Sequence, residues 1–386
     1  MNLHQRQIFR KRKPSKDKKR DAYFIIYTKA LISDKRCDKI LSDEKSFGAT
    51  NNQRSDRQYM KTTVKISSTF DHGNTEVLDT LLKIKELDPN YDEVVFDLSY
   101  HNDCNPFNNL LIAKTLANFK RNNPSTKKSI LPCKNTNTDS YLQHIGFYKF
   151  FGVEHGKDVG VAQASYHYVP ITPIEFDIFF YEGIEKYGEK LAKLLSFDRN
   201  LYEFSKYIFI EIIRNIYEHS GSNEAYMCAQ TWDRYNLTEI AILDSGCGIS
   251  NALCHIYKDS SEEELLRMAT SPGISAQSNF GYTDKNDGWR NSGYGLYVLK
   301  RLALEYGGSL MICSNNYCDY YHRNGTISHY KTFYPGTALA IRFKTDQNIN
   351  FAETRRRIVA EGEKESSDIH GAIKSASKSS GGHYHK

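Results

Sequence analysis

From residue 61 onward, strand-like and helix-like patterns follow one another along the chain, and this alternation limits the possible folds more than any other feature. The patterned segments come in the order strand 62–68, helix 76–86, strand 93–98, helix 110–119, strand 129–132 and helix 140–151. Strands that alternate with helices are typical of α/β proteins. We therefore predict an α/β domain in this part of the chain.

The length of the chain leaves room for a second domain and for a flank at each end, because 386 residues can bury two cores. Pro170 and Pro173 disfavour helix and fit an extended connection between domains. From Ser366 onward the chain is rich in Ser, Gly and Lys, a composition typical of disorder. The predicted parts are an arm with an unassigned segment at 1–60, the α/β domain at 61–165, a linker at 166–176, a second domain at 177–345 and a polar, disordered tail at 346–386.

The composition is typical of a soluble globular protein. Hydrophobic residues make up 39% and charged residues 25% of the chain, and no apolar run approaches the length of a membrane helix. The first residues are basic, but no apolar core follows them as it would in a secretory signal. We expect a cytoplasmic protein that does not bind membranes. Its eight cysteines show no C-x-x-C pair and no zinc-ligand spacing, so we expect free thiols.

Positive charge is concentrated at the start of the sequence. Residues 1–20 contain nine Lys or Arg and a single acidic residue, Asp17. Such a run can bind a polyanion, which makes nucleic acid a candidate partner. A solvated, disordered arm is the alternative interpretation.

A helix with two conspicuous polar residues is predicted over 201–219. Glu211 and Asn215 lie one turn apart, on the face that also carries Glu218 or His219. The many isoleucines around them predict that most of this helix is buried. A buried carboxylate and amide are costly to desolvate unless they bind something. They are therefore candidates for a binding site, and a polar stripe that faces solvent is the alternative.

The strand predicted at 237–243 ends at an acidic residue, Asp244, which is followed by Gly246 and Gly248. A carboxylate at this position can accept a hydrogen bond from an exocyclic amine such as that of adenine. The glycines allow a flat ring to approach the backbone. The D-x-G-x-G pattern also occurs in ordinary turns, so it is weak evidence when taken alone.

A second glycine pair, Gly293 and Gly295, precedes Leu296 and a helix predicted at 297–306. Backbone N–H groups at the start of a helix have no partner within it and suit phosphate oxygens. No G-x-x-x-x-G-K-[ST] loop is present, and the dinucleotide pattern G-x-G-x-x-G fails at Val298. The P-loop and Rossmann nucleotide folds are therefore disfavoured.

These three motifs, in this order, resemble those of the histidine-kinase-like ATPase superfamily (the GHKL or Bergerat fold), which includes gyrase B, histidine kinases and anti-sigma-factor kinases. The resemblance covers about residues 190–345 and is closest to the anti-sigma-factor kinases. It implies an α/β sandwich with a mixed sheet covered by helices, and it implies ATP and Mg²⁺ as ligands. The implied roles are Glu211 as catalytic base, Asn215 as Mg²⁺ and ATP ligand, Asp244 as adenine acceptor, and Gly246, Gly248, Gly293, Gly295, Leu296 and Thr337 as further ATP-binding residues.

The first domain resembles the STAS-like module of anti-sigma-factor antagonists over about residues 61–160. The resemblance rests on the segments Val94–Ser99, Asn105–Phe107 and Ile145–Phe147. In phosphorylatable members a Ser or Thr begins the helix at the place where this chain has Pro106 and Phe107. We therefore expect a structural or partner-binding module rather than a phosphoacceptor.

Residues 250–292 are polar and interrupted by Pro and Gly, with a short helix expected to begin within 260–264. They are typical of a lid that closes over a nucleotide, or of an ordinary flexible insertion. Lys285, Arg290 and Lys300 are candidates for contact with phosphates.

We predict a Mg²⁺-dependent ATPase that uses nucleotide binding and hydrolysis to switch a lid or a dimer. Its partner would be a protein that binds the STAS-like domain or the lid. Two alternatives stay open: a serine/threonine kinase of the anti-sigma-factor type, and a non-catalytic ATP-sensing scaffold that binds partners or nucleic acid. A two-component histidine kinase is disfavoured, because no long helical pair with an exposed His precedes the second domain.

Overall fold

The computed structural model describes residues 58–66, 75–157, 167–174, 181–195, 198–276 and 292–377. Residues from Gln58 onward form one compact unit, separate from residues 1–57. The basic arm, Lys285 and Arg290 lie outside the described residues. No helix in the described ranges is long and apolar enough to span a membrane.

The first half contains a three-stranded parallel sheet in the order β1-β2-β3. Helices cross over from each strand to the next, as parallel strands require. The elements are β1 (Lys61–Lys65), α4 (Glu76–Lys85), β2 (Glu93–Asp97), α5 (Pro106–Asn122), β3 (Lys127–Leu131), α6 (Thr136–His144) and α7 (Phe147–Phe151). The predicted α/β pattern is confirmed. The helix expected at 140–151 is instead two helices, because Gly146 adopts a left-handed φ of +81° between them.

The second half contains a five-stranded sheet in the order β4-β5-β6-β8-β7, and every described pairing in it is antiparallel. Its strands are β4 (Tyr168–Pro173), β5 (Ala225–Trp232), β6 (Leu237–Asp244), β7 (Ser309–Tyr321) and β8 (Ile327–Lys344). The prediction of a mixed sheet is wrong, because β5–β6 and β7–β8 are hairpins whose strands run in opposite directions. The predicted linker at 166–176 contributes the edge strand β4.

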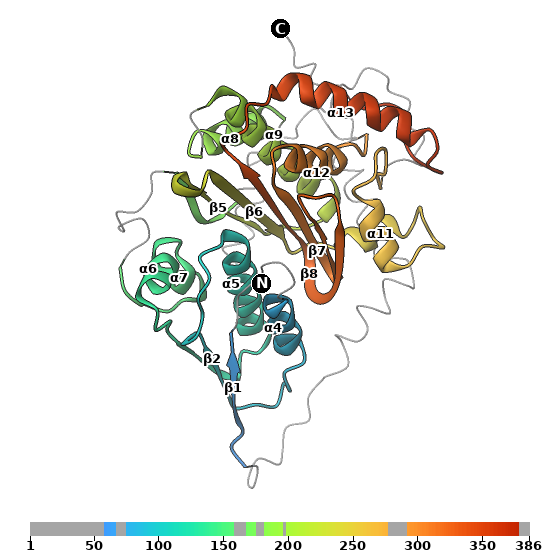
Figure 1. Cartoon of the computed structure of the whole chain (residues 1–386). Helices are drawn as coiled ribbons and strands as arrows, with labels where there is room; N and C mark the ends of the chain where they lie inside the picture. Colours follow the sequence, from blue (N-terminus) through green and yellow to red (C-terminus); the bar gives the residue numbers. More distant parts are fainter. Residues whose placement is uncertain are drawn as a thin grey trace, which may run out of the picture. The chain divides into compact units, whose positions relative to one another are not determined.

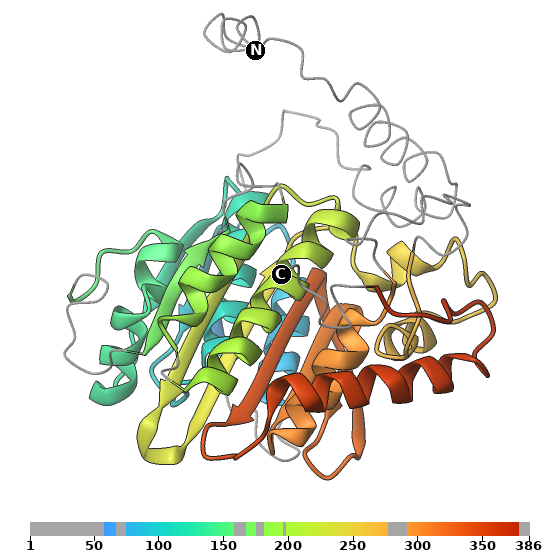
Figure 2. The ribbon, with the colours of Figure 1, turned by 90° about the horizontal axis from the view of Figure 1, so that it is seen from above.

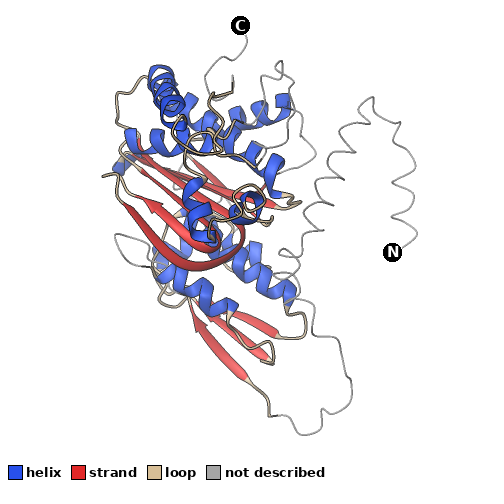
Figure 3. Ribbon diagram, turned by 90° about the vertical axis from the view of Figure 1, so that its right-hand side faces the viewer, coloured by secondary structure: helices blue, strands red, loops and turns tan. Residues whose placement is uncertain are grey.

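Helices α4 and α5 lie between the two sheets, so layers of sheet and helix alternate through the described unit (Figures 1 and 3). One buried cluster combines side chains of both halves, including Phe96 and Leu110 from the first and Leu243 and Ala340 from the second. The described chain is therefore a mixed α/β protein in which a parallel sheet and an antiparallel sheet share one helical layer.

Four helices cover the other face of the antiparallel sheet (Figures 1 and 2). They are α8 (Tyr181–Ala192), α9 (Arg199–Asn215), α12 (Gly295–Glu305) and α13 (Phe351–Ser366). A second core forms beneath them, in which Phe204 stacks on Tyr306 with ring centroids 4.5 Å apart and packs against Phe343. This layer contains the first and third motifs, and the second motif follows from the end of β6.

Two predictions about the second half need correction. The tail expected from residue 346 contains α13, whose Phe351, Ile358 and Val359 are buried against the layer of α9 and α12. Spaced among many charged residues, they bury one face of an otherwise polar helix. The thiols of Cys313 and Cys318 are not free, because the two sulfurs are bonded to each other within β7.

Candidate functional site

A pocket opens between α9, α12 and the ends of β6 and β8 and encloses about 860 Å³ of space without protein atoms, open solvent at its mouth included. The predicted residues that line it are Asn215, Asp244, Gly248, Gly293, Gly295, Leu296 and Thr337. Gly246 and Glu211 do not line it. Residues far apart in the sequence are therefore brought together in one pocket.

Most of the pocket wall is apolar. Ile242 and Leu339 contribute from the sheet, and Leu253, Ala269 and Ile274 contribute from the segment that follows β6. These residues also belong to buried clusters, so their positions are set by packing. An apolar slot with few polar groups suits a flat heterocyclic ring.

Helix α9 ends in a wider turn at the pocket. Asp198 caps its N-terminus by accepting hydrogen bonds from the backbone N–H groups of the first turn. After Asn215 the chain continues as one π-helical turn, η2 (Ile216–Ser220), in which Ser220 Oγ donates to the carbonyl oxygen of Ile216 at 2.7 Å. Such turns are frequent at functional sites. This one places His219 in the pocket lining.

His219 has an uncharged imidazole at neutral pH. Burial, together with the nearby positive charge of Arg214, lowers the pKa of His219 to about 4. A neutral ring leaves one nitrogen as a hydrogen-bond acceptor and the other as a donor. The pocket can thus offer a ligand a polar group without a charge at this point.

Asp244 ends β6, and its side chain is only 3% exposed. Its Oδ1 accepts a hydrogen bond of 2.7 Å from the backbone N–H of Gly246. Burial raises the pKa of this carboxyl to about 7, although backbone hydrogen bonds from Gly246 and Thr337 oppose the shift. A further donor, such as an amine of a bound ligand, would favour the ionised form.

The glycines after Asp244 are required by contacts within the protein. A Cβ on Gly246 would lie 2.2 Å from the carbonyl oxygen of Ser220, and one on Gly248, whose φ is +80°, would lie 2.1 Å from Asn315 Oδ1. Chain packing therefore explains both glycines, whereas the sequence suggested close approach of a ligand. Only Gly248 also borders the pocket.

A bulge in β7 holds the loop after Asp244. Ser314 Oγ accepts a hydrogen bond of 2.8 Å from the backbone N–H of Ile249, and Asn315 Nδ2 donates to the carbonyl oxygen of Cys247 at 3.3 Å. Asn315 adopts a left-handed φ of +53°, which is unusual for a residue with a side chain. The sequence did not point to these two residues, because their role depends on the register between β7 and β8.

The same loop is tied to the first half of the chain. The backbone N–H of Ser245 donates to the carbonyl oxygen of Glu224 at 3.1 Å. The Glu224 carboxylate forms ion pairs with Lys114 at 2.7 Å and Arg121 at 3.1 Å, both on α5. Hydrogen bonds from Lys114 and Arg121 outweigh burial and lower the pKa of Glu224 to about 2.

Glu211 is fully buried next to the pocket. Its Oε2 pairs with Arg214 at 2.5 Å, while its Oε1 accepts no hydrogen bond from the described residues. Burial raises the pKa of Glu211, although the charges of Arg214 and Arg355 oppose the shift. The sequence placed Glu211 on the correct helix face but did not reveal its pairing with Arg214.

Gly295 brings the first and third motifs together. It begins α12, and a Cβ at this position would lie 2.6 Å from Glu211 Oε2 and 3.8 Å from Asn215 Nδ2. Gly293, with a φ of +71°, packs equally closely on the backbone of Ile274. Glycine is therefore needed at 295 for the start of α12 to reach α9, and at 293 for the loop to reach Ile274.

Positive charge is scarce at the pocket. None of the described lining residues is Lys or Arg. Lys300 lies outside the lining, with Nζ 3.4 Å from Thr270 Oγ1, and burial lowers its pKa to about 8. Within the described ranges, no group of three or more His, Cys, Asp or Glu side chains is placed to hold a metal ion. A metal here would need ligands supplied by a bound molecule.

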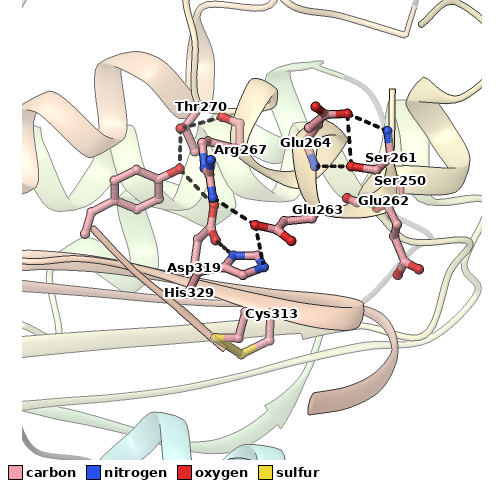
Figure 4. A network of polar contacts seen from close by, with 12 residues as sticks. Ser250, Ser261, Glu262, Glu263, Glu264, Arg267, Thr270, Cys313, Asp319 and His329 are labelled. Atoms are coloured by element: carbon pink, nitrogen blue, oxygen red, sulfur yellow. Dashed lines mark hydrogen bonds and ion pairs between the residues drawn. A yellow bond between two sulfur atoms is a disulfide. The ribbon is translucent and has the colours of Figure 1, made fainter. Parts of the chain in front are cut away.

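The segment after β6 forms α10 (Ile249–Leu253) and α11 (Glu262–Met268). Ser261 and Glu264 form a reciprocal capping box at the start of α11, which confirms the helix expected to begin within 260–264. Polar contacts join α11 to the β7–β8 hairpin (Figure 4): Glu263 lies 3.3 Å from His329, which also pairs with Asp319. The rest of the predicted lid, residues 277–291, lies outside the described residues.

No protein-family model matches this chain, and a search of curated proteins finds no significant match. Both family resemblances in the sequence therefore remain predictions. What the described residues define is a mixed α/β protein with one parallel and one antiparallel sheet and a polar-ended, mostly apolar pocket.

Proposed function

We propose that this chain is a Mg²⁺-dependent ATP-binding protein of the histidine-kinase-like ATPase superfamily, with a STAS-like module in its first half. One observation carries the proposal: the three motifs meet in a single pocket. Asn215 comes from the end of α9, Asp244 from the end of β6, and Gly293 and Gly295 from the start of α12.

The residues of the pocket fit the parts of ATP. The buried carboxylate of Asp244 needs a further hydrogen-bond donor, which the adenine amine supplies. The apolar walls accept the ring, and the backbone N–H groups at the start of α12 suit phosphate oxygens. Bound Mg²⁺ would neutralise phosphate charge, with the side-chain oxygen of Asn215 and the phosphates as its ligands.

We further propose that Glu211 acts as the base for ATP hydrolysis. It is a buried carboxylate with a raised pKa beside Asn215 and the start of α12, which suits a general base. In the described structure Arg214 holds it outside the pocket. Hydrolysis thus requires Glu211 to turn toward an attacking water. A non-catalytic ATP sensor would also hold Glu211 outside the pocket. Such a sensor is therefore our second candidate function.

A kinase that phosphorylates its own STAS-like half is disfavoured. Helix α5 begins at Pro106, and no hydroxyl stands at its first positions. The backbone N–H of Phe107 instead donates to Glu239 Oε1 of β6 at 2.8 Å. The helix start at which such modules are phosphorylated is thus packed against the antiparallel sheet. A kinase would have to act on another protein.

The test is to incubate the protein with γ-labelled ATP and Mg²⁺ and to follow both released phosphate and labelled protein. Binding is measured in parallel by calorimetry with Asp244→Asn and Asn215→Ala. We expect Asp244→Asn to lose ATP affinity at least tenfold, because it replaces the charged acceptor of the adenine amine with a neutral amide, whose hydrogen bond is weaker. Unchanged affinity would show that ATP does not bind here. Label on protein would favour the kinase, and binding without either product would favour the sensor.

A further inference from the structure

Residues 367–377, which follow α13, form a packed segment that we call the C-terminal strap. Lys374 Nζ donates to the carbonyl oxygens of Ser366, Ser367 and Ile369, which closes the end of α13. Ala372 is buried in a cluster with Leu253, from the segment after β6. The strap is therefore part of the folded unit, although its composition predicts disorder.

The strap holds one wall of the pocket. The backbone N–H of Ile373 donates to the carbonyl oxygen of Gly273 at 2.8 Å. The two backbones are so close that a Cβ on Gly273 would lie 2.2 Å from the carbonyl oxygen of Ile373. The residues that follow Gly273, Ile274 to Ala276, line the pocket. This wall is thus anchored from behind by the strap.

The strap also holds the loop that begins α12. Tyr294 is fully buried, and its hydroxyl lies 3.1 Å from the carbonyl oxygen of Ile373, to which it donates, and 3.0 Å from Ser366 Oγ. Nearby, Ser292 Oγ accepts a hydrogen bond of 2.9 Å from the backbone N–H of Ser377. Both flanks of the pocket therefore converge on the backbone of Ile373, one through its N–H and the other through its carbonyl oxygen.

Tyr294 stands between the two glycines that border the pocket. Its neighbours Gly293 and Gly295 present backbone to the pocket, while the Tyr294 side chain extends to the strap. Glycines lose much conformational freedom when they are ordered, so a loop that contains two of them is costly to fix on ligand binding. A tether from the residue between them reduces that cost in advance.

We propose that Tyr294 is a positioning residue for the phosphate end of this site. Through the hydrogen bond of the Tyr294 hydroxyl, the C-terminal strap fixes the loop 293–295 and so sets its affinity for the terminal phosphates. The proposal rests on the nucleotide site proposed above and adds the means by which the C-terminal part of the chain controls it.

The test compares Tyr294→Phe with Tyr257→Phe in the full chain. Tyr294→Phe keeps the ring and removes the hydroxyl. Tyr257→Phe is the matched control, because the Tyr257 hydroxyl also donates to the strap, at the carbonyl oxygen of Gly371 and 3.4 Å away, but from the segment after β6. Calorimetry measures the affinity of each variant for a non-hydrolysable ATP analogue with Mg²⁺ and for adenosine, which has no phosphate.

We expect Tyr294→Phe to lose about fivefold or more in affinity for the ATP analogue, as for one hydrogen bond, and to bind adenosine within twofold of the unaltered protein. Tyr257→Phe should change neither. Removing residues 367–386 should lower affinity for the analogue further, whereas removing only 378–386 should not. Equal losses for both ligands would overturn the proposal, because a general loss of structure does not distinguish phosphate from adenine.

A second measurement does not depend on ATP. Hydrogen–deuterium exchange of residues 292–298 should be faster in Tyr294→Phe than in the unaltered protein and in Tyr257→Phe. Unchanged exchange overturns the role of Tyr294 whatever the binding result. If the unaltered protein binds no ATP but exchange of residues 292–298 is still faster in Tyr294→Phe, the nucleotide proposal fails. The role of Tyr294 in fixing the loop then still holds.

Discussion

The two faces of the antiparallel sheet differ in the size of their side chains. The face toward α4 and α5 carries mainly small residues, such as Cys228, Ala241 and Ala340, whereas the face toward α9 and α12 carries large ones such as Ile242 and Leu339. Small residues allow α4 and α5 to pack closely on the sheet without a large cavity. Beyond the larger residues, at the strand ends, the pocket opens.

On each side of the sheet a fully buried glutamate pairs with an arginine: Glu239 of β6 on the side of α5, and Glu211 of α9 on the other side. Glu239 pairs with Arg342 and accepts the N–H of Phe107, so both of its oxygens have partners. Glu211 pairs with Arg214 through one oxygen, and the other has no partner among the described residues. A buried polar group without a partner is costly and rarely kept for packing alone. Glu239 therefore has a structural role, and the unpartnered oxygen of Glu211 supports the catalytic role that we propose for it.

The largest effect is expected for Glu239→Ala. It leaves the Arg342 charge and the backbone N–H of Phe107 without their acceptor, which should lower the free energy of unfolding by about 3 to 5 kcal/mol. Chemical denaturation measures this loss. Glu239→Gln keeps one acceptor and should lose less. If the alanine variant were as stable as the unaltered protein, the contrast between the two glutamates would not hold.

Glu211→Gln should affect rate more than structure. Its amide can still accept from Arg214 but cannot take a proton, so we expect phosphate release to fall about a hundredfold while ATP affinity changes little. A steady-state phosphate assay and calorimetry make the comparison. An unchanged rate would remove Glu211 from the chemistry and favour the ATP sensor.

Ala241→Leu tests the close packing on the α4 and α5 side. Ala241 is fully buried, so the added side chain forces a shift that should cost about 1 to 3 kcal/mol of stability. Because Ala241 faces away from the pocket, adenosine affinity should stay within twofold. A large loss of affinity with no loss of stability would show that the two faces are not independent.

The last prediction is a pH dependence at Asp244. Burial raises its pKa to about 7 from 3.8, so between these values the native state keeps a proton that the unfolded chain loses. The free energy of unfolding should therefore fall as pH rises through this window. Adenosine binding needs the ionised carboxylate and should strengthen with pH, by at most tenfold per unit, up to about pH 7.

The control for this pH dependence is Asp244→Asn, in which the rise in adenosine affinity should be absent between pH 5 and 7. The fall in stability should become smaller but persist, because burial also raises the pKa of Asp103 to about 7. His219, which also lines the pocket, has a pKa near 4 and stays uncharged over that range. Adenosine is used because it lacks titrating phosphates. A rise in adenosine affinity that persists in the Asn variant would be assigned to another group.

The sequence predicted the strands and helices of residues 61–151 well, because their apolar periodicity is local. It also placed Asp244 and Gly295 at the ends of the elements where the structure has them, whereas Asn215, expected inside a helix, ends α9. The ATP ligand and the family assignment stay predictions. The local sequence pattern was sufficient to predict a helix or strand wherever its position depended on that element alone.

What the sequence did not predict depends on distant partners. Helix α13 is stable because Ile358 and its neighbours bury against α9 and α12, a contact that its polar composition conceals. The antiparallel sheet follows from the insertion of β8 between β6 and β7, which no local period encodes. The roles of Arg214 and Asn315 likewise arise only when separate segments meet.

The ion pairs of Glu224 have a mechanical consequence. Glu224 pairs through its side chain with helix α5 and accepts, through its backbone carbonyl, a hydrogen bond from Ser245 in the turn that follows Asp244. It therefore connects α5 to this turn. A protein that bound the first half of the chain and displaced α5 would therefore pull on this turn and alter the pocket without entering it. Because Arg121 is well exposed, high ionic strength would weaken its share of this connection first.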